Sequence, residues 1–310
     1  MKLLFLSRLK LSAVYVLILL SSFAYSCTDI DNVDENLKII HEKTFTILPG
    51  KDLHLDASLG NINVTSWSKN EVHIKILGNA KAKEKVEFLF NESEDKIEIQ
   101  AKYDWSLFMS LKNVKLIFEI QVPREFNLKT ITAGGDIKIQ DVKGKIYSRT
   151  SGGDIILSQV NGKTDIGTSG GDISFNNSYG DINASTSGGN IKGNKFSGKI
   201  EVSTSGGDIE LIGSDSRIFG TTSGGDITLD YSGQNHGIEL ETSGGDINVS
   251  MPKDINAQAH FSTSGGSIKS EFKGNNAIEI SSSKFEAEIN DGGNAIVLKT
   301  SGGDITVRKK

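Results

Sequence analysis

The sequence has 310 residues, of which 36% are hydrophobic and 7% aromatic, and its formal net charge at neutral pH is -5. This acidic balance argues against nucleic acid as a partner, because phosphate binding requires a concentrated basic face. The single cysteine excludes an intramolecular disulfide.

Residues 1–26 have the three parts of an export signal. Basic Arg8 and Lys10 precede an apolar run over residues 11–24, and the small Ser26 follows. The run is shorter than the about 20 residues that a permanent membrane helix needs, and no later segment is apolar enough. We therefore expect an exported protein of the cell envelope with a soluble mature part.

The only cysteine, Cys27, follows this segment directly, in the string Ala24-Tyr25-Ser26-Cys27. The string resembles a bacterial lipobox, in which the cysteine is lipidated and becomes the new N-terminus. The resemblance implies a membrane partner reached through a lipid anchor, and an outer-membrane or surface lipoprotein. The alternative is an ordinary cleavage site formed by the small Ala24 and Ser26, which leaves Cys27 as an incidental free thiol.

Residues 27–41 are predicted to be an acidic tether. They contain Asp29, Asp31, Asp34 and Glu35 and few large apolar side chains, a composition typical of solvated chain. A flexible segment of this length has a root-mean-square span of roughly 20 Å, enough to lift the following domain clear of lipid headgroups.

Residues 42–131 lack a strict repeat but keep the alternation of apolar and polar residues that is typical of strands. Leu53 with Leu55 and Ile97 with Ile99 are examples. The stretch Gly-Asn-Ile-Asn-Val at residues 60–64 resembles a degenerate copy of the Gly-Asp-Ile unit that repeats later in the chain. We expect an irregular β-rich N-terminal cap that shares one sheet with the rest of the chain.

The one aromatic cluster of the chain contains Trp105, Phe108 and Met109. Aromatic side chains of this kind can anchor a ligand or a partner, which makes these three residues a candidate binding loop. The alternative is a loop that folds over the open first coil and hides apolar surface.

From residue 132 onward one string recurs, and it decides the fold class. Thr-Ser-Gly-Gly-Asp-Ile begins at Thr150, Thr168, Thr204, Thr222, Thr242 and Thr300, and near-copies begin at Thr132, Thr186 and Thr263. The first glycine recurs every 18 residues from Gly134 to Gly224. A fixed period of this length predicts one solenoid coil per repeat, and residues 281–289 are expected to be a degenerate coil.

The apolar residues of each repeat define two strands. An isoleucine follows the first glycine by three residues, and a second apolar residue follows two positions later, which is the period of a strand. A second apolar pair precedes the glycines, such as Ile200 with Val202 and Ile278 with Ile280. The predicted fold is all-β, a parallel β-helix (β-solenoid) of about ten short coils over residues 132–310, with isoleucine ladders inside.

The corners of the coil have predicted roles of their own. The glycine pair is expected to make a sharp turn with positive φ, at a place where stacked coils leave no space for side chains. The threonine before it is expected to form a ladder with hydrogen bonds between coils. At the chain end, Arg308, Lys309 and Lys310 are expected to protect an exposed edge against end-to-end pairing.

Aspartates occupy equivalent positions beside the glycine pair, and these candidate cation-interacting residues are Asp136, Asp154, Asp172, Asp208, Asp226, Asp246 and Asp304. Calcium-binding β-rolls also use aspartates on adjacent turns, but with a different spacing from glycine. Asn190 and Ser267 interrupt the row. We therefore favour a row in which each carboxylate caps its own glycine turn, and predict no metal site and no cofactor.

Several of these segments together resemble a known family. They are a Phe-x-Ile opening before Pro-Gly at residues 45–50, the Leu-Gly-Asn-Ile-Asn-Val stretch at residues 59–64, Val122-Pro123, and the serial Gly-Asp-Ile units. Their order resembles the bacterial putative-adhesin families of unknown function, which are similar to auto-transporter adhesin head domains. The resemblance covers residues 42–310 and implies a β-helix on the cell envelope, with no catalytic residues.

The sequence favours a non-enzymatic surface binding module or adhesin, with a surface glycan or a protein as its ligand. One alternative is a structural or envelope-stress protein without a dedicated ligand, and another is a carbohydrate-active enzyme. The enzyme is disfavoured because no pair of carboxylates stands out. The histidines are also scattered without metal-ligand spacing, at His41, His54, His73, His236 and His260.

Overall fold

The computed structural model describes residues 37–103 and 113–310. The chain divides into two compact units, Met1–Glu35 and Asn36–Lys310, and the described residues belong to the second. The predicted signal, Cys27, most of the tether and the candidate loop with Trp105, Phe108 and Met109 lie outside the described residues. No helix among the described residues has the length and apolar character needed to cross a membrane.

The described residues form 25 strands and one short helix, α1 (Ala80–Lys85). The strands before the first glycine pair are β1 (Lys38–Thr46), β2 (Asp52–Ala57), β3 (Asn61–Trp67), β4 (Glu71–Gly78), β5 (Val86–Glu92), β6 (Lys96–Tyr103), β7 (Leu116–Pro123) and β8 (Asn127–Thr132). The strands of the regular repeats are β9 (Ile137–Gln140), β10 (Ile146–Arg149), β11 (Ile155–Ser158), β12 (Thr164–Gly167), β13 (Ile173–Tyr179), β14 (Ile182–Ser185), β15 (Ile191–Ser203) and β16 (Ile209–Thr222). The remaining strands are β17 (Ile227–Ser232), β18 (Ile238–Thr242), β19 (Ile247–Met251), β20 (Ala257–Thr263), β21 (Ile268–Ser270), β22 (Asn275–Ile280), β23 (Lys284–Ile289), β24 (Ala295–Thr300) and β25 (Ile305–Lys309).

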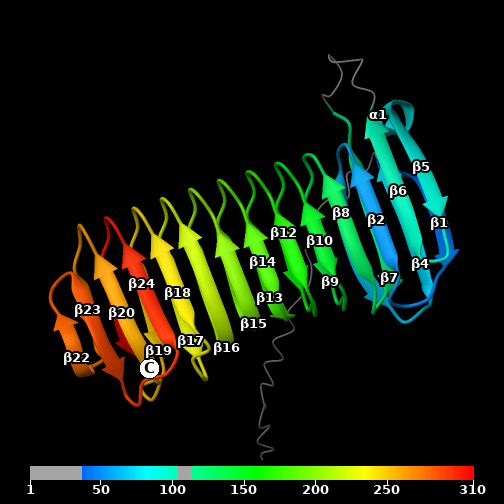
Figure 1. Cartoon of the computed structure of the whole chain (residues 1–310). Helices are drawn as coiled ribbons and strands as arrows, with labels where there is room; N and C mark the ends of the chain where they lie inside the picture. The colour runs from blue at the N-terminus through cyan, green and yellow to red at the C-terminus, as the bar shows by residue number, and fades with distance from the viewer. Residues whose placement is uncertain (1–36, 104–112) are drawn as a thin grey trace, which may run out of the picture. The chain divides into compact units, whose positions relative to one another are not determined.

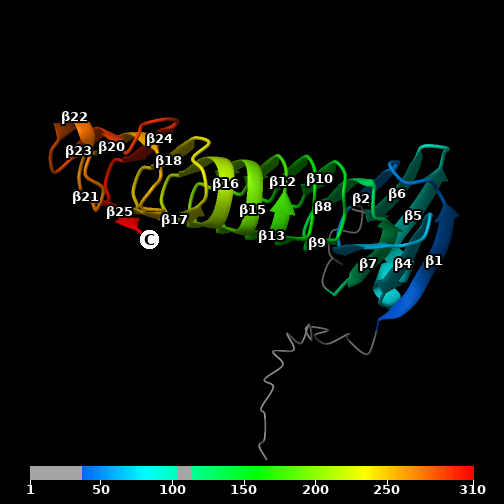
Figure 2. The same ribbon diagram turned by 90° about the horizontal axis from the view of Figure 1, so that it is seen from below.

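Each repeat contributes one strand before its glycine pair and one strand after it, and these lie on two faces. On the first face β8, β10, β12 and β14 pair in parallel, and on the second face β9, β11 and β13 do so. The long strands β15 and β16 bend and serve both faces. Figure 2 shows β8, β10 and β12 along one side of the stack and β9 and β13 along the other. The long sheet is therefore wound into a solenoid.

The stacking register equals the sequence period, because equivalent residues of successive repeats pair directly. Ile155 pairs with Ile173 and Ile173 with Ile191 on the second face. The ladder isoleucines from Ile137 to Ile247, and Ile305, are at most 1% exposed, whereas Ile268 is only partly buried. The prediction of buried isoleucine ladders is thus confirmed, with Ile268 as the exception. Burying each of these side chains contributes about 1.5–3 kcal/mol.

Two coils lie out of sequence order, one near each end of the stack. On the first face β2 pairs with both β6 and β8, and on the second face β3 pairs with both β7 and β9. At the other end β24 lies between β18 and β20, and β25 lies between β19 and β21. Figure 1 shows the red β24 between the yellow β18 and the orange β20. The expectation that Arg308, Lys309 and Lys310 follow an exposed last edge is therefore wrong, because β25 is paired on both sides.

Antiparallel strands cover the ends, so the expectation of a purely parallel β-helix needs correction. β1 pairs with β4, β4 with β7, and β5 with β6, all antiparallel. At the other end β20 pairs with β23 and β23 with β22 in the same sense. Residues 281–289 are therefore not a degenerate coil but contain the covering strand β23. Ile280 is 58% exposed rather than buried, because it lies on the outermost strand β22.

The N-terminal strands begin earlier than the sequence indicated and join the same sheet. β1 starts at Lys38, inside the range assigned to the tether, because its backbone pairs with β4 up to Gly78. Ile62 of β3 pairs with Ile137 of the first regular repeat, so the Gly-Asn-Ile stretch does occupy the position of a Gly-Asp-Ile unit. The cap and the repeats therefore share one core.

Candidate functional site

The glycine corner, which we define as the Thr-Ser-Gly-Gly-Asp turn of each repeat, is shaped by close approach of neighbouring coils. A Cβ added to the second glycine, for example Gly207, would lie under 3.0 Å from the carbonyl oxygen of Gly189 in the preceding coil. The first glycine, Gly206, has at least 3.6 Å of space. Neither has a positive φ, so the predicted left-handed turn is wrong and the lack of space alone requires glycine.

The repeated threonine fastens each glycine corner to the preceding coil of the stack. The hydroxyl of Thr204 donates to the carbonyl oxygen of Gly189 at 2.8 Å and accepts from the N–H of Gly207 at 3.3 Å. The same pair of hydrogen bonds occurs at Thr150, Thr168, Thr186, Thr222, Thr242, Thr263 and Thr300. The predicted bonds between coils are confirmed, with the backbone as partner.

The aspartate row is bound along the solenoid axis and not within each turn. Oδ1 of Asp208 accepts from the backbone N–H of Asp226 in the next coil at 2.9 Å, and Asp226 in turn accepts from Asp246. The same contact links Asp136, Asp154, Asp172 and Asn190 at one end and Asp246, Asp304 and Ser267 at the other. The expectation that each carboxylate caps its own turn is therefore wrong. Asn190 fits because an amide oxygen accepts the same bond.

These bonds affect the acidity of one member of the row. The backbone N–H and the hydroxyl of Ser267 both donate to Asp304 and hold the pKa of its carboxyl below its usual value. Within the described ranges, no group of three or more His, Cys, Asp or Glu side chains is placed to hold a metal ion. The role of the row as a cation site stays a prediction that the geometry does not test.

A groove of about 520 Å³ opens on the first face, and we call it the lysine groove. Its lining side chains are Asp52, His54, Asn127, Lys129, Lys145, Tyr147, Lys163 and Asp165, with Leu128 and Ile146 between them. They come from four neighbouring coils, because β2, β8, β10 and β12 pair in register. His54, Lys129, Tyr147 and Asp165 form one outward row across these strands.

Most polar groups at the edge of the lysine groove have partners within the protein. Arg149 pairs with Asp165 at 2.7 Å, and its guanidinium lies 4.5 Å from the ring centre of Tyr147. The Asn127 amide donates to Asp52 at 2.8 Å and its oxygen accepts from the backbone N–H of Lys145. These bonds hold the edge of the groove in one arrangement.

The charged groups of the lysine groove are unevenly balanced. Lys129, Lys145 and Lys163 form no ion pair with any other described residue, and all three are exposed. Burial and the charge of Lys96 lower the pKa of His54, which keeps its ring neutral at pH 7. The groove therefore presents three unpaired ammonium groups on an acidic chain.

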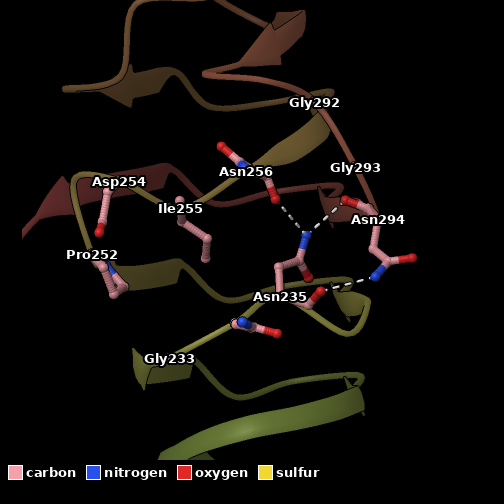
Figure 3. Close-up of a pocket in the computed structure, with 10 residues that line it drawn as sticks. Gly233, Asn235, Pro252, Asp254, Ile255, Asn256, Gly292, Gly293 and Asn294 are labelled. Carbon is pink, nitrogen blue, oxygen red and sulfur yellow. Dashed lines mark hydrogen bonds between the residues drawn. The ribbon is translucent and has the colours of Figure 1, made fainter.

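A second hollow, the asparagine pocket, has a volume of about 630 Å³ and lies where three turns meet. The turns are residues 233–235, 252–256 and 292–294, brought together because β24 lies between β18 and β20. Figure 3 shows the Asn235 amide between the other two turns, where it donates to the carbonyl oxygens of Asn294 at 2.7 Å and Asn256 at 3.2 Å. Asn294 donates back to Asn235 at 2.9 Å. These amides fasten the inserted coil.

Neither hollow is among the sites predicted from the sequence. The signal for the lysine groove was present, since Lys145 and Lys163 are 18 residues apart and so occupy the same place in successive coils. The contribution of β2 had no such signal, because β2 lies outside the regular repeats. The asparagine pocket depends on the position of β24, which the repeat does not specify.

A family model described as Toastrack DUF4097 matches residues 51–308 of the chain. No curated protein matches the sequence significantly. Among solved structures, a protein titled a putative adhesin from Bacteroides fragilis is 12% identical, with 89% of this chain and 98% of that chain covered and a TM-score of 0.37. A putative adhesin from Parabacteroides distasonis is 11% identical, with 88% and 98% covered and a TM-score of 0.37. A putative cell adhesion protein from Clostridium sporogenes is 12% identical, with 87% and 99% covered and a TM-score of 0.26.

Proposed function

Since this chain belongs to the Toastrack DUF4097 family, we propose from its own residues that it is a non-enzymatic binding module of the bacterial cell envelope. Its scaffold is a parallel β-helix of short coils closed by antiparallel strands. Residues 1–26 direct export, and a lipid on Cys27 holds the module at a membrane, which makes it an outer-membrane or surface lipoprotein. The ligand is a surface glycan or a protein.

The observation that carries this proposal is the open lysine groove across four neighbouring coils. A groove made of parallel strands presents its side chains in straight rows, and such rows suit an extended ligand that contacts several coils at once. Tyr147, 38% exposed, adds an aromatic surface to the row. Binding sites with an exposed aromatic side chain among polar groups are common at interfaces.

An enzymatic role is less well supported by the same residues. Hydrolysis of a glycosidic bond needs two carboxylates that face each other across the bond, about 5–10 Å apart. The carboxylates of the aspartate row lie in line along one corner, and each of them uses Oδ1 to accept a backbone N–H. That arrangement favours a structural role for the row.

The proposal is tested by incubating the purified full chain with an array of bacterial and host glycans and with immobilised extracellular matrix proteins. We expect retention on at least one class of ligand, above that of an unrelated lipoprotein of similar net charge. Absence of retention on every probe would contradict the binding role and favour a structural envelope protein without a dedicated ligand.

The anchor has its own test. Cys27→Ser removes the thiol that would carry the lipid, so we expect this variant in the soluble envelope fraction while the wild type fractionates with membranes. The control is Ser26→Ala, which keeps the thiol and a small residue before it. Membrane fractionation of the Cys27→Ser variant equal to the wild type would disprove lipid anchoring.

A further inference from the structure

The three lysines of the lysine groove form no ion pair with any described residue of the protein. Lys145 and Lys163 occupy the same position in successive coils, where strands lie about 4.8 Å apart, so their ammonium groups repel each other. Lys129 of β8 lies beside Tyr147 in the outward row, two residues further along the strand than the position of Lys145. A bound anion would replace the missing counter-charges.

The two carboxylates in the groove do not supply these counter-charges. Asp165 is engaged by Arg149 at 2.7 Å and by the amide of Asn183 at 3.3 Å. Asp52 accepts from Asn127 at 2.8 Å and forms no ion pair with the three lysines. The carboxylates are thus held by neighbours at the rim, while the ammonium groups project on flexible stems into the solvent.

We propose that the lysine groove binds an anionic polysaccharide, laid along the solenoid axis with its acidic groups on Lys129, Lys145 and Lys163 and a sugar ring on Tyr147. This inference rests on the proposed function and names its ligand class. A polysaccharide with repeated acidic groups can contact ammonium groups on successive coils at the same time. A single small anion cannot contact all three lysines in this way. The exposed ring of Tyr147 provides the apolar surface on which a sugar face packs.

A flat anionic membrane fits this surface less well. The position that holds Lys145 and Lys163 holds the exposed Asp181 in the next coil. Lys199 and Arg217 follow at this position, and Lys199 pairs with Glu201 at 2.6 Å. The positive charges of this face are therefore interrupted by carboxylates and do not form the broad basic patch that a membrane surface attracts. A chain that enters the groove avoids the acidic coils beyond it.

The test measures binding of the purified full chain to four probes: polygalacturonate, dextran sulfate, neutral dextran, and vesicles that contain phosphatidylglycerol. We expect binding to at least one of the two acidic polymers, no binding to dextran, and weakening as NaCl rises from about 50 mM to about 500 mM. The two acidic polymers distinguish carboxylate from sulfate as the recognised group.

The deciding variant is Lys145→Gln with Lys163→Gln, which should weaken polymer binding by about tenfold or more. The matched control is Lys138→Gln with Lys192→Gln, which removes the same charge from exposed positions of the second face and should leave the affinity within about twofold. Tyr147→Ala should weaken binding without changing the salt dependence. Thermal unfolding followed by circular dichroism checks that each variant folds.

Three outcomes would overturn the inference. In the first, the deciding variant and the control bind the acidic polymer with equal affinity. In the second, the chain binds the vesicles but neither acidic polymer. In the third, it binds neither acidic polymer nor the vesicles. If the chain nevertheless retains a neutral glycan or a protein in the array described above, the proposed binding function survives and only the ligand class is wrong. If it retains nothing at all, both fail.

Discussion

The glycine corner and the return corner, the turn that leads back to each first-face strand, are built on different principles. At the glycine corner the threonine hydroxyl and the second glycine contact the preceding coil of the stack, and Oδ1 of the aspartate, or of Asn190, accepts from the next coil. At the return corner the turns differ. Gly162, Gly180 and Gly198 have positive φ in successive coils, but Ser216 takes this place in the next coil and the turn after Ser232 is longer.

This difference locates the places where the surface can vary. At the glycine corner the threonine, the second glycine and the aspartate tolerate little change, because a substitution at any of these three positions affects two coils. The return corner has fewer such bonds, and both hollows open beside it: the lysine groove just after its turns and the asparagine pocket at its longest turns. The repeated motif therefore marks the scaffold, and the variable turns mark the candidate binding surfaces.

The largest expected effect separates the two glycines of one corner. Gly207→Ala places a Cβ under 3.0 Å from a backbone oxygen of the neighbouring coil, so we expect a loss of at least about 3 kcal/mol in the free energy of unfolding, or no folding. Gly206→Ala, where 3.6 Å is available, should change stability by no more than about 0.5 kcal/mol. Chemical denaturation of both variants measures the difference, and equal stabilities would refute the close-approach explanation.

The threonine should have the next largest effect. Thr204→Val keeps the shape of the buried side chain but removes both hydrogen bonds of its hydroxyl and leaves the carbonyl of Gly189 and the N–H of Gly207 without that partner. We expect a loss of about 2 kcal/mol. The neighbouring Ser205→Ala, at an exposed position, is the control and should be nearly neutral. A neutral Thr204→Val variant would mean that packing alone holds the corner.

The aspartate row should have a smaller effect, because its side chains are exposed. Asp208→Ala leaves the N–H of Asp226 to water and should cost about 1 kcal/mol, whereas Asp208→Asn keeps the acceptor, as Asn190 does, and should cost less.

Millimolar calcium should leave the melting temperature of the wild type nearly unchanged. Occupied calcium sites would instead stabilise the fold by about 2.7 kcal/mol at one hundred times their dissociation constant, and a chelator would reverse the shift.

The smallest expected effect is the pH response of Asp304. Its folded-state pKa is depressed by the N–H and hydroxyl of Ser267, so the charged carboxylate contributes stability above its unfolded pKa of about 3.9 and loses that contribution as the pH falls through the folded value. Ser267→Ala removes one donor and should raise this pKa toward the usual value. An NMR titration of the Asp304 carboxyl in both proteins measures the change. Identical titration curves would show that the hydroxyl is not involved.

The order of stacking at the C-terminal end could not be read from the sequence for a definite physical reason. The repeat that begins at Thr300 has the same six residues as five others, so its hydrogen bonds fit any neighbouring coil of this kind. It stacks on the repeat that begins at Thr242, 58 residues away, and is covered in turn by the repeat that begins at Thr263. A local motif specifies how coils stack but not which coils become neighbours.

Local sequence determined the all-β class, the two strands per repeat, the buried isoleucines and the threonine bonds between coils, because each follows from a period that repeats inside every coil. Tertiary structure alone decided the insertion of β2 with β3 and of β24 with β25, the antiparallel covers, and hence the two hollows. A given coil can stack on several other coils with nearly the same local hydrogen bonds and packing. Which of them becomes its neighbour depends on how the strands at each end close over the core. The lysine groove combines both, since the repeat period aligns Lys145 with Lys163, and the out-of-order β2 adds Asp52 and His54 beside them.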